Sequence, residues 1–289
     1  MKFVTYKYKN LEQAGVLTPD ESSVISAHSL GFKAESMNEW IRELDGSLPD
    51  LPKECDTIPL SDVKLEAPIP VPLQDVICLG LNYRDHVEEA TKADAVFDVQ
   101  RGDAVYFAKR LQRAVAPNDK IDGHFDICDS LDYEVELAVV IGKDAKNVKA
   151  ENAADYIFGY SILNDVSARN LQTRHKQWYF GKSLDDFTPM GPCIVSAGDI
   201  GAAPELDIRC YVNGQLRQNS NTRMMIFDIP YIIEELSAGM TLKAGTIIAT
   251  GTPSGVALGM SPETRVYLKS GDVIRCEIDG IGVLENTVK

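Results

Sequence analysis

Positive charge is scarce in this chain. Its 289 residues include 29 lysines and arginines against 43 aspartates and glutamates, so the formal net charge is −14 at pH 7. We therefore expect no nucleic-acid partner, because binding a phosphate backbone requires a basic surface. The same shortage argues against binding to an anionic membrane. A small acidic substrate stays possible if a metal ion, a lysine or an arginine supplies positive charge inside a site.

Closely spaced cysteines and long apolar runs are also missing. The six cysteines include no C-x-x-C pair, so we expect neither a thiolate zinc site nor a redox motif, but free thiols in a reducing compartment. No apolar run approaches the ~20 residues that span a bilayer. Residues 1–8 lack the apolar segment of a signal peptide. Together these absences predict a cytoplasmic protein.

A proline-rich stretch divides the chain. Residues 48–72 contain Pro49, Pro52, Pro59, Pro68, Pro70 and Pro72. Such a density of proline is incompatible with regular strand pairing or helix and is typical of a linker. We predict a small N-terminal α+β domain over residues 1–70, with a helix capped by Ser36, and a main domain over residues 71–289.

The alternation of apolar residues over 131–142 predicts a strand. Glu134 and Glu136 would share one face of it, about 6.5–7 Å apart along the backbone. That face continues with Ala138 and Val140, so two carboxylates there are costly unless a cation joins them. A divalent metal is the simplest such cation, since Mg²⁺ binds a few carboxylates and keeps water or substrate in its other positions. The alternative is an edge strand whose glutamates face water.

Two further segments add ionisable groups. Asp165 follows the apolar run 156–164 and is a candidate third metal ligand. A helix that opens at Asn82 would place His86 and Glu89 on one face, because they are three residues apart. A carboxylate beside an imidazole orients it and raises its basicity, which suits a general base. The alternative is a structural or solvated histidine.

The segments after Asp165 also carry polar groups. Ser167 is predicted to cap a helix that carries Arg169 and Gln172 three positions apart. Loop 250–255 offers hydroxyls and backbone donors to an anion, but it lacks the lysine of a nucleotide P-loop.

An aromatic loop surrounds a single lysine. Residues 177–187 include Trp178, Phe180 and Lys182. Loops of this composition are typical of site walls, with core packing of the aromatic side chains as the alternative. Beyond it the pattern is mostly β, with a type I′ hairpin predicted at Asn213-Gly214.

Five motifs in this order resemble the fumarylacetoacetate hydrolase family, over roughly residues 73–288. They are G-L-N-Y-x-D-H-x-x-E at 80–89, D-Y-E-x-E at 132–136, N-D-V-S-A-R-x-x-Q at 164–172, G-K-S at 181–183 and T-G-T-P-x-G-V at 250–256. The resemblance implies a β-rich α+β fold, a mixed β-roll or sandwich with peripheral helices, and a homodimer. Residues 1–72 match only as the variable N-terminal segment of longer members.

The resemblance also implies a site that holds Mg²⁺, Mn²⁺ or Ca²⁺ on three carboxylates. Carried over residue by residue, the metal ligands are Glu134, Glu136 and Asp165. The catalytic residues are His86, Glu89 and Lys182. The substrate-binding residues are Arg169, Gln172, Thr252 and Tyr83.

For such a protein we expect metal-dependent hydrolysis of a C–C bond in an acylpyruvate or a related 1,3-dicarbonyl acid. The metal would stabilise an enolate as a Lewis acid, and His86 with Glu89 would deprotonate a water. Oxaloacetate decarboxylation and isomerisation of a keto–enol or 2-hydroxyhepta-2,4-diene-1,7-dioate type use the same enolate and stay open. A non-catalytic metal-stabilised module is the alternative from another class, but it would need neither His86 nor Lys182. A metal-dependent phosphatase or nuclease is disfavoured because the sequence has no second acidic cluster.

Overall fold

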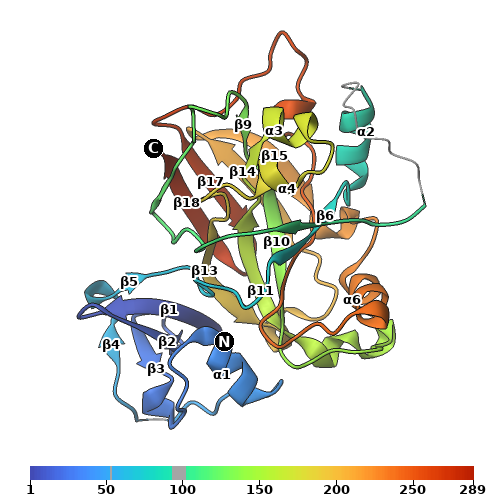
Figure 1. Cartoon of the computed structure of the whole chain (residues 1–289). Coiled ribbons are helices and arrows are strands. Elements are labelled where there is room, and N and C mark those ends of the chain that lie inside the picture. Colours follow the sequence, from blue (N-terminus) through green and yellow to red (C-terminus); the bar gives the residue numbers. More distant parts are fainter. Residues whose placement is uncertain (53, 93–101) are drawn as a thin grey trace.

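The largest sheet is the frame on which the rest of the molecule is built. The computed structural model describes residues 1–52, 54–92 and 102–289 (Figure 1), and within them this sheet has eleven strands. In spatial order they are β4 (Ile58–Pro59), β3 (Ser23–Ser26), β2 (Leu11–Leu17), β1 (Lys2–Tyr8), β13 (Met190–Ser196), β11 (Ile157–Asn164), β10 (Val135–Ile141), β16 (Ile247–Ala249), β6 (Val76–Gly80) and β7 (Val105–Lys109), with β5 (Lys64–Leu65) paired to β1.

Two smaller sheets complete the β structure of the described residues. The five-stranded sheet has the order β15 (Gln215–Asn221), β14 (Asp207–Val212), β17 (Val273–Ile278), β18 (Gly282–Val288) and β8 (Lys120–Ile121), and β12 (Ser167–Ala168) pairs with β9 (Leu131–Asp132). Asn213 and Gly214 have φ angles of 50° and 76°, so the predicted hairpin turn, which requires two positive φ values, is confirmed. The predicted β-rich α+β class is confirmed as well.

The helices are short and lie around the sheets (Figure 1). They are α1 (Met37–Leu44), α2 (Arg84–Lys92), α3 (Arg169–Arg174), α4 (Tyr179–Lys182), α5 (Ala197–Ile200) and α6 (Ile229–Gly239), with 3₁₀ turns η1 (His28–Leu30), η2 (Leu60–Asp62), η3 (Ala150–Tyr156), η4 (Thr222–Met224) and η5 (Ala257–Gly259). Ser36 caps α1, since its side chain accepts a hydrogen bond from the Glu39 amide. Across the described residues, no helix combines the length and the apolarity that crossing a bilayer requires.

Strand β10 lies inside the molecule and is buried on both faces. It pairs with β11 on one side and β16 on the other. Leu137 and Val139 belong to the core cluster that includes Ile274 of the second sheet. Val140 belongs to a second cluster together with Trp40 of α1. An edge strand with water-facing glutamates is therefore the wrong interpretation of this segment.

The N-terminal segment continues the main sheet. Strand β1 pairs antiparallel with β13, with Phe3 opposite Ile194. The Phe3 ring also packs against Phe158 of β11, with 4.6 Å between ring centroids, and against Trp40 at 5.2 Å. Sheet hydrogen bonds and core packing thus cross the predicted domain division at residue 70, which stays a prediction.

Candidate active site

Three carboxylates meet beside the paired strands β10 and β11. Glu134 precedes β10, Glu136 lies within it, and Asp165 directly follows β11. The register sets Val135 opposite Asn164, and the Asp165 amide donates to the Glu134 carbonyl at 2.8 Å. One oxygen from each carboxylate lies within 4.8 Å of the other two. The residues Glu134, Glu136 and Asp165 are 5%, 1% and 0% exposed, so this cluster is inside the protein.

The strand predicted over 131–142 is two strands, and the break is beside the cluster. Strand β9 ends at Asp132 and pairs with β12, whereas β10 starts at Val135. Between them, the Glu134 amide donates to the Asn164 side-chain oxygen at 3.0 Å. Glu134 therefore lies in the two-residue gap between the strands, where its amide bonds to a side chain instead of a neighbouring strand.

Three buried cations contact these carboxylates. Lys182 Nζ lies 2.7 Å from both Glu134 Oε2 and Asp165 Oδ2. Lys109 Nζ lies 2.6 Å from Asp165 Oδ1, and Arg169 Nη2 lies 2.6 Å from Glu134 Oε1. Burial alone would raise the pKa of Glu134, but the charges of Lys182 and Arg169 outweigh it and lower that pKa to about 2.

Glu136 has a different environment. Burial, followed by the charges of Asp165 and Glu134, raises its pKa well above the usual value. The Gly251 amide donates to its Oε2 at 2.8 Å. A third negative charge is therefore unfavourable here unless another cation is added. Three converging carboxylate oxygens are the donor set that hard divalent cations prefer, so the residues fit such an ion. Two of the carboxylate oxygens, Glu134 Oε2 and Asp165 Oδ2, would then contact both the ion and Lys182.

The predicted histidine–glutamate pair is formed on α2. His86 Nδ1 lies 3.3 Å from Glu89 Oε2. Glu89 is held in turn by the Gly255 amide, which donates to its two oxygens at 3.0 and 3.1 Å. The helix begins at Arg84, two residues later than predicted, because the Asn82 side chain is engaged with the main chain of Phe227 and Thr250 instead.

Helix α3 carries Arg169 and Gln172 on one side, as predicted. Arg169 Nη1 donates to Gln172 Oε1 at 3.0 Å, and its Nε donates to Asp132 Oδ2 at 2.8 Å. The predicted Ser167 cap is wrong. Ala168 precedes the helix, and the Ser167 hydroxyl donates to the Asp165 carbonyl at 2.8 Å, because Ser167 belongs to strand β12.

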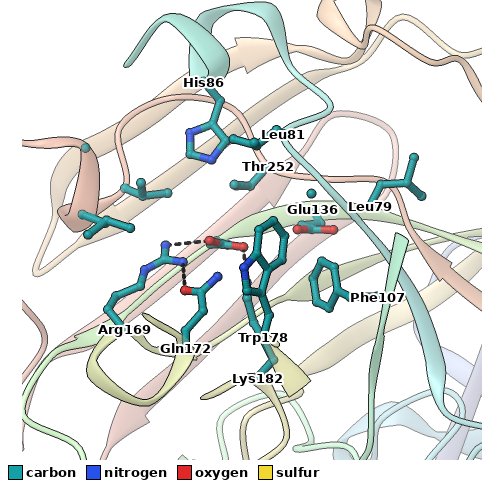
Figure 2. A pocket seen from close by; sticks show the side chains of 15 residues that line it. Leu79, Leu81, His86, Phe107, Glu136, Arg169, Gln172, Trp178, Lys182 and Thr252 are labelled. Atoms are coloured by element: carbon teal, nitrogen blue, oxygen red, sulfur yellow. Dashed lines mark hydrogen bonds and ion pairs between the residues drawn. The ribbon is translucent and has the colours of Figure 1, made fainter. Parts of the chain in front are cut away.

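A pocket of about 480 Å³, counting the part open to solvent, lies among these groups. In Figure 2, His86 lies across it from Arg169 and Gln172, with Trp178 and Phe107 along one side. Its polar lining is His86, Glu134, Glu136, Arg169, Gln172, Lys182 and Thr252, and its apolar lining is Leu79, Gly80, Leu81, Phe107, Trp178, Val256, Leu258 and Gly259.

Three residues of the predicted site are outside this lining. Asp165 lies behind the pocket lining in contact with Lys182, and Glu89 lies behind it in contact with His86. Tyr83 is fully buried in the core and does not line the pocket.

The aromatic loop forms a wall of the pocket. Trp178 lines it and packs edge-on against Phe107, with 5.2 Å between ring centroids. Phe180 is 45% exposed, so the alternative of core packing is wrong for that side chain.

Two buried residues at the site were missed by sequence reasoning. Lys109 ends the apolar strand β7, and a lysine in that position is the only signal that marks it. Asp132 belongs to the D-Y-E-x-E motif, where it received no role. Its carboxylate accepts hydrogen bonds from Arg169 and from the amides of Ala257 and Leu258.

A family model and a curated relative both match most or all of this chain. Residues 75–289 match the family model "Fumarylacetoacetate (FAA) hydrolase C-terminal". The chain is 44% identical to "Oxaloacetate tautomerase YisK" of Bacillus subtilis (strain 168), with 100% of both chains covered.

Solved structures agree with this match. A fumarylacetoacetate hydrolase from psychrophilic Exiguobacterium antarcticum has a TM-score of 0.86 and 38% identity, and the match covers 100% of this chain and 99% of that one. A maleylpyruvate hydrolase from Sphingobium sp. SYK-6, in complex with manganese(II) ion and pyruvate, has a TM-score of 0.76 and 30% identity, over 100% and 98% of the two chains. The protein thus belongs to the fumarylacetoacetate hydrolase family, whose members are metal-dependent hydrolases, isomerases and decarboxylases.

Proposed function

We propose that this enzyme holds a divalent metal ion on Glu134, Glu136 and Asp165 and hydrolyses a C–C bond of an acylpyruvate or a related 2-oxo acid. One observation carries the proposal: a single pocket is lined by two of these buried carboxylates and, from another element, by His86 of the His86–Glu89 pair (Figure 2). A metal site that only stabilised the fold would not require that pair.

The roles of the side chains follow from their positions. Arg169 and Lys182 supply positive charge for the substrate carboxylate and the adjacent 2-oxo oxygen, and Gln172 and Thr252 contribute polar contacts. The ion, when bound, supplies a Lewis acid for the negative charge that develops on the 2-oxo oxygen.

The proton transfer belongs to His86. With its Nδ1–H donated to Glu89, its Nε2 is free of a proton and is the atom that accepts one from water. Glu89 then stabilises the imidazolium. The deprotonated water attacks the distal carbonyl carbon, the C–C bond breaks, and the enolate of pyruvate leaves with the electron pair.

The apolar side of the pocket supports a substrate with a hydrocarbon acyl group. Leu79, Phe107, Trp178, Val256 and Leu258 line it. These side chains would bury such a group favourably, whereas a second carboxylate placed there would lose its hydration.

Keto–enol tautomerisation of oxaloacetate is the second candidate, because the Bacillus subtilis relative of that name matches over its whole length. In this reaction His86 would move a proton at C3 of the substrate without admitting water. Oxaloacetate decarboxylation and isomerisation of an unsaturated ketodioate pass through the same enolate. Family membership supports all of these reactions over a non-catalytic module.

A substrate panel tests the proposal. EDTA-treated enzyme is assayed with acylpyruvates and oxaloacetate, with and without Mg²⁺ or Mn²⁺, following pyruvate release and the ultraviolet absorbance of the enol. We expect metal-dependent pyruvate release from acylpyruvates, and a loss of about 10²- to 10⁴-fold in His86→Ala with metal binding retained. Enol decay of oxaloacetate without acylpyruvate cleavage would establish the second candidate instead. Full activity of His86→Ala or of the EDTA-treated enzyme would contradict both.

We also propose a cytoplasmic homodimer that uses Mg²⁺, with Mn²⁺ or Ca²⁺ as alternatives. All six cysteines are free, five of them buried, which suits a reducing compartment. The dimer rests on the family resemblance, and light scattering of the purified protein tests it directly.

A further inference from the structure

Each carboxylate of the acidic triad has one oxygen already bound by a donor of the chain. The three contacts are Arg169 Nη2 to Glu134 Oε1 at 2.6 Å, the Gly251 amide to Glu136 Oε2 at 2.8 Å, and Lys109 Nζ to Asp165 Oδ1 at 2.6 Å. The donors come from three different segments. Lys182 contacts the second oxygen of Glu134 and of Asp165, so a bound ion would share those two oxygens with the Lys182 ammonium group.

Of the two side-chain donors in this set, Arg169 lines the pocket and Lys109 does not. Lys109 is 0% exposed. Besides Asp165, its ammonium group donates to the Val166 carbonyl at 2.9 Å and to the Lys182 carbonyl. An ammonium group has three protons, and all three are used. Any rotation of Lys109 would leave a buried donor without a partner, which costs about 1–3 kcal/mol or more, so its hold on Asp165 Oδ1 is rigid.

Lys182 differs from Lys109. It lines the pocket and contacts Glu134 Oε2 and Asp165 Oδ2, the oxygens that Arg169 and Lys109 leave free. Lys182 would therefore lie close to a bound substrate, whereas Lys109 is outside the pocket lining and acts through Asp165 and the backbones of Val166 and Lys182.

We propose that Lys109 is a positioning residue: by holding Asp165 Oδ1 it disfavours binding of a metal ion through both oxygens of Asp165, and so lowers the affinity of the site for Ca²⁺ relative to Mg²⁺ and Mn²⁺. The inference rests on the proposed metal-dependent function and adds the choice of ion. Mg²⁺ requires near-ideal octahedral geometry, whereas Ca²⁺ takes six to eight oxygens and uses bidentate carboxylates. An ammonium group on one carboxylate oxygen repels a metal ion that approaches the same oxygen, so chelation through both oxygens becomes unfavourable.

Calorimetric titration of Lys109→Met with metal salts tests the choice of ion. Metal-free wild type and variant are titrated with MgCl₂, MnCl₂ and CaCl₂, and the ratio of the Ca²⁺ Kd to the Mn²⁺ Kd is compared. Wild type is expected to favour Mn²⁺ and Mg²⁺. In the variant, Asp165 Oδ1 is no longer held by an ammonium group and becomes available to the ion. The ratio of the Ca²⁺ Kd to the Mn²⁺ Kd should therefore fall about 10-fold, within the range seen when a residue that holds a metal ligand is changed. A ratio rather than a single affinity is used because the lost positive charge strengthens binding of every divalent ion.

The outcomes separate this inference from the proposed function. Lys243→Met is the control, because Lys243 pairs with Asp144 at 2.6 Å on the surface, and its ratio should match wild type. An unchanged ratio in Lys109→Met, with binding intact, overturns the role of Lys109 and leaves the proposed function standing. Wild type that binds none of the three ions overturns the proposed function itself.

A crystal structure of the wild type with Mn²⁺ gives a second test, which does not depend on the folding of a variant. We expect Glu134, Glu136 and Asp165 each to contact the ion through one oxygen, with Lys109 still bound to Asp165 Oδ1. A bidentate Asp165 in that structure overturns the inference.

Discussion

At the scale of single residues, Asp132 connects the two walls of the pocket. It is fully buried and binds Arg169 Nε at 2.8 Å on one side. On the other side it accepts the amides of Ala257 and Leu258 at 2.8 and 3.0 Å, at the start of η5. Leu258 lines the apolar wall, so one carboxylate positions both the arginine and the hydrophobic side.

Substitution of Asp132 by Asn should therefore affect binding and stability together. The amide keeps the shape but removes the charge that is paired with the buried Arg169. We expect the free energy of unfolding to fall by about 3 kcal/mol, as when a buried ion pair loses one partner, and KM for the substrate to rise. Urea denaturation and steady-state kinetics measure these effects. A free energy of unfolding and a KM equal to those of the wild type would show that Arg169 is positioned without the Asp132 charge.

At the scale of elements, α3 and α4 approach each other at Gly181. A Cβ atom there would lie 2.4 Å from the Gln172 amide nitrogen and 2.7 Å from the Ala168 carbonyl oxygen, distances too short for real contacts. The close approach brings Lys182, the next residue, against the acidic triad. The G-K-S motif thus combines a packing requirement with a charged side chain.

Gly181→Ala should push α4 away from α3. We expect destabilisation by about 1–3 kcal/mol, as for overpacking in a filled core, and a loss of activity larger than this loss of stability explains, because Lys182 moves with α4. Gly198→Ala in α5 is the matched control, since its Cβ would have no heavy atom of the described residues within 4 Å. Thermal melting and kcat of the two variants are compared. Equal melting temperatures and equal kcat values in the two variants would exclude the packing role of Gly181.

At the scale of the whole molecule, the N-terminal segment covers an edge of the main sheet. Without β1, strand β13 would expose unpaired backbone groups, and Phe158 would lose the Phe3 ring. Exposed strand edges promote aggregation. The segment therefore contributes to the stability of the part that carries the candidate site, although it supplies none of the pocket-lining residues.

Removal of residues 1–70 tests this dependence and the predicted domain division together. We expect the fragment 71–289 to aggregate or to melt at a lower temperature than the full chain, measured by light scattering and calorimetry. Adding the fragment 1–70 should partly restore the solubility. A soluble fragment with the melting temperature of the full chain would instead establish residues 71–289 as an independent domain.

Sequence alone determined the local features of this protein. Apolar alternation located β10, a continuous apolar run located β11, the Asn213-Gly214 pair located the hairpin turn, and motif spacing identified the candidate ligands. These features depend on residues close together in the chain, so a pattern can report them.

Tertiary structure alone decided how distant segments meet. It split the strand over 131–142, because β9 pairs with β12, and it buried Tyr83 away from the pocket. It also brought Lys109 to Asp165, 56 positions along the chain. Contacts of this kind depend on how the sheets pack, and no local pattern records which buried charge will find which partner.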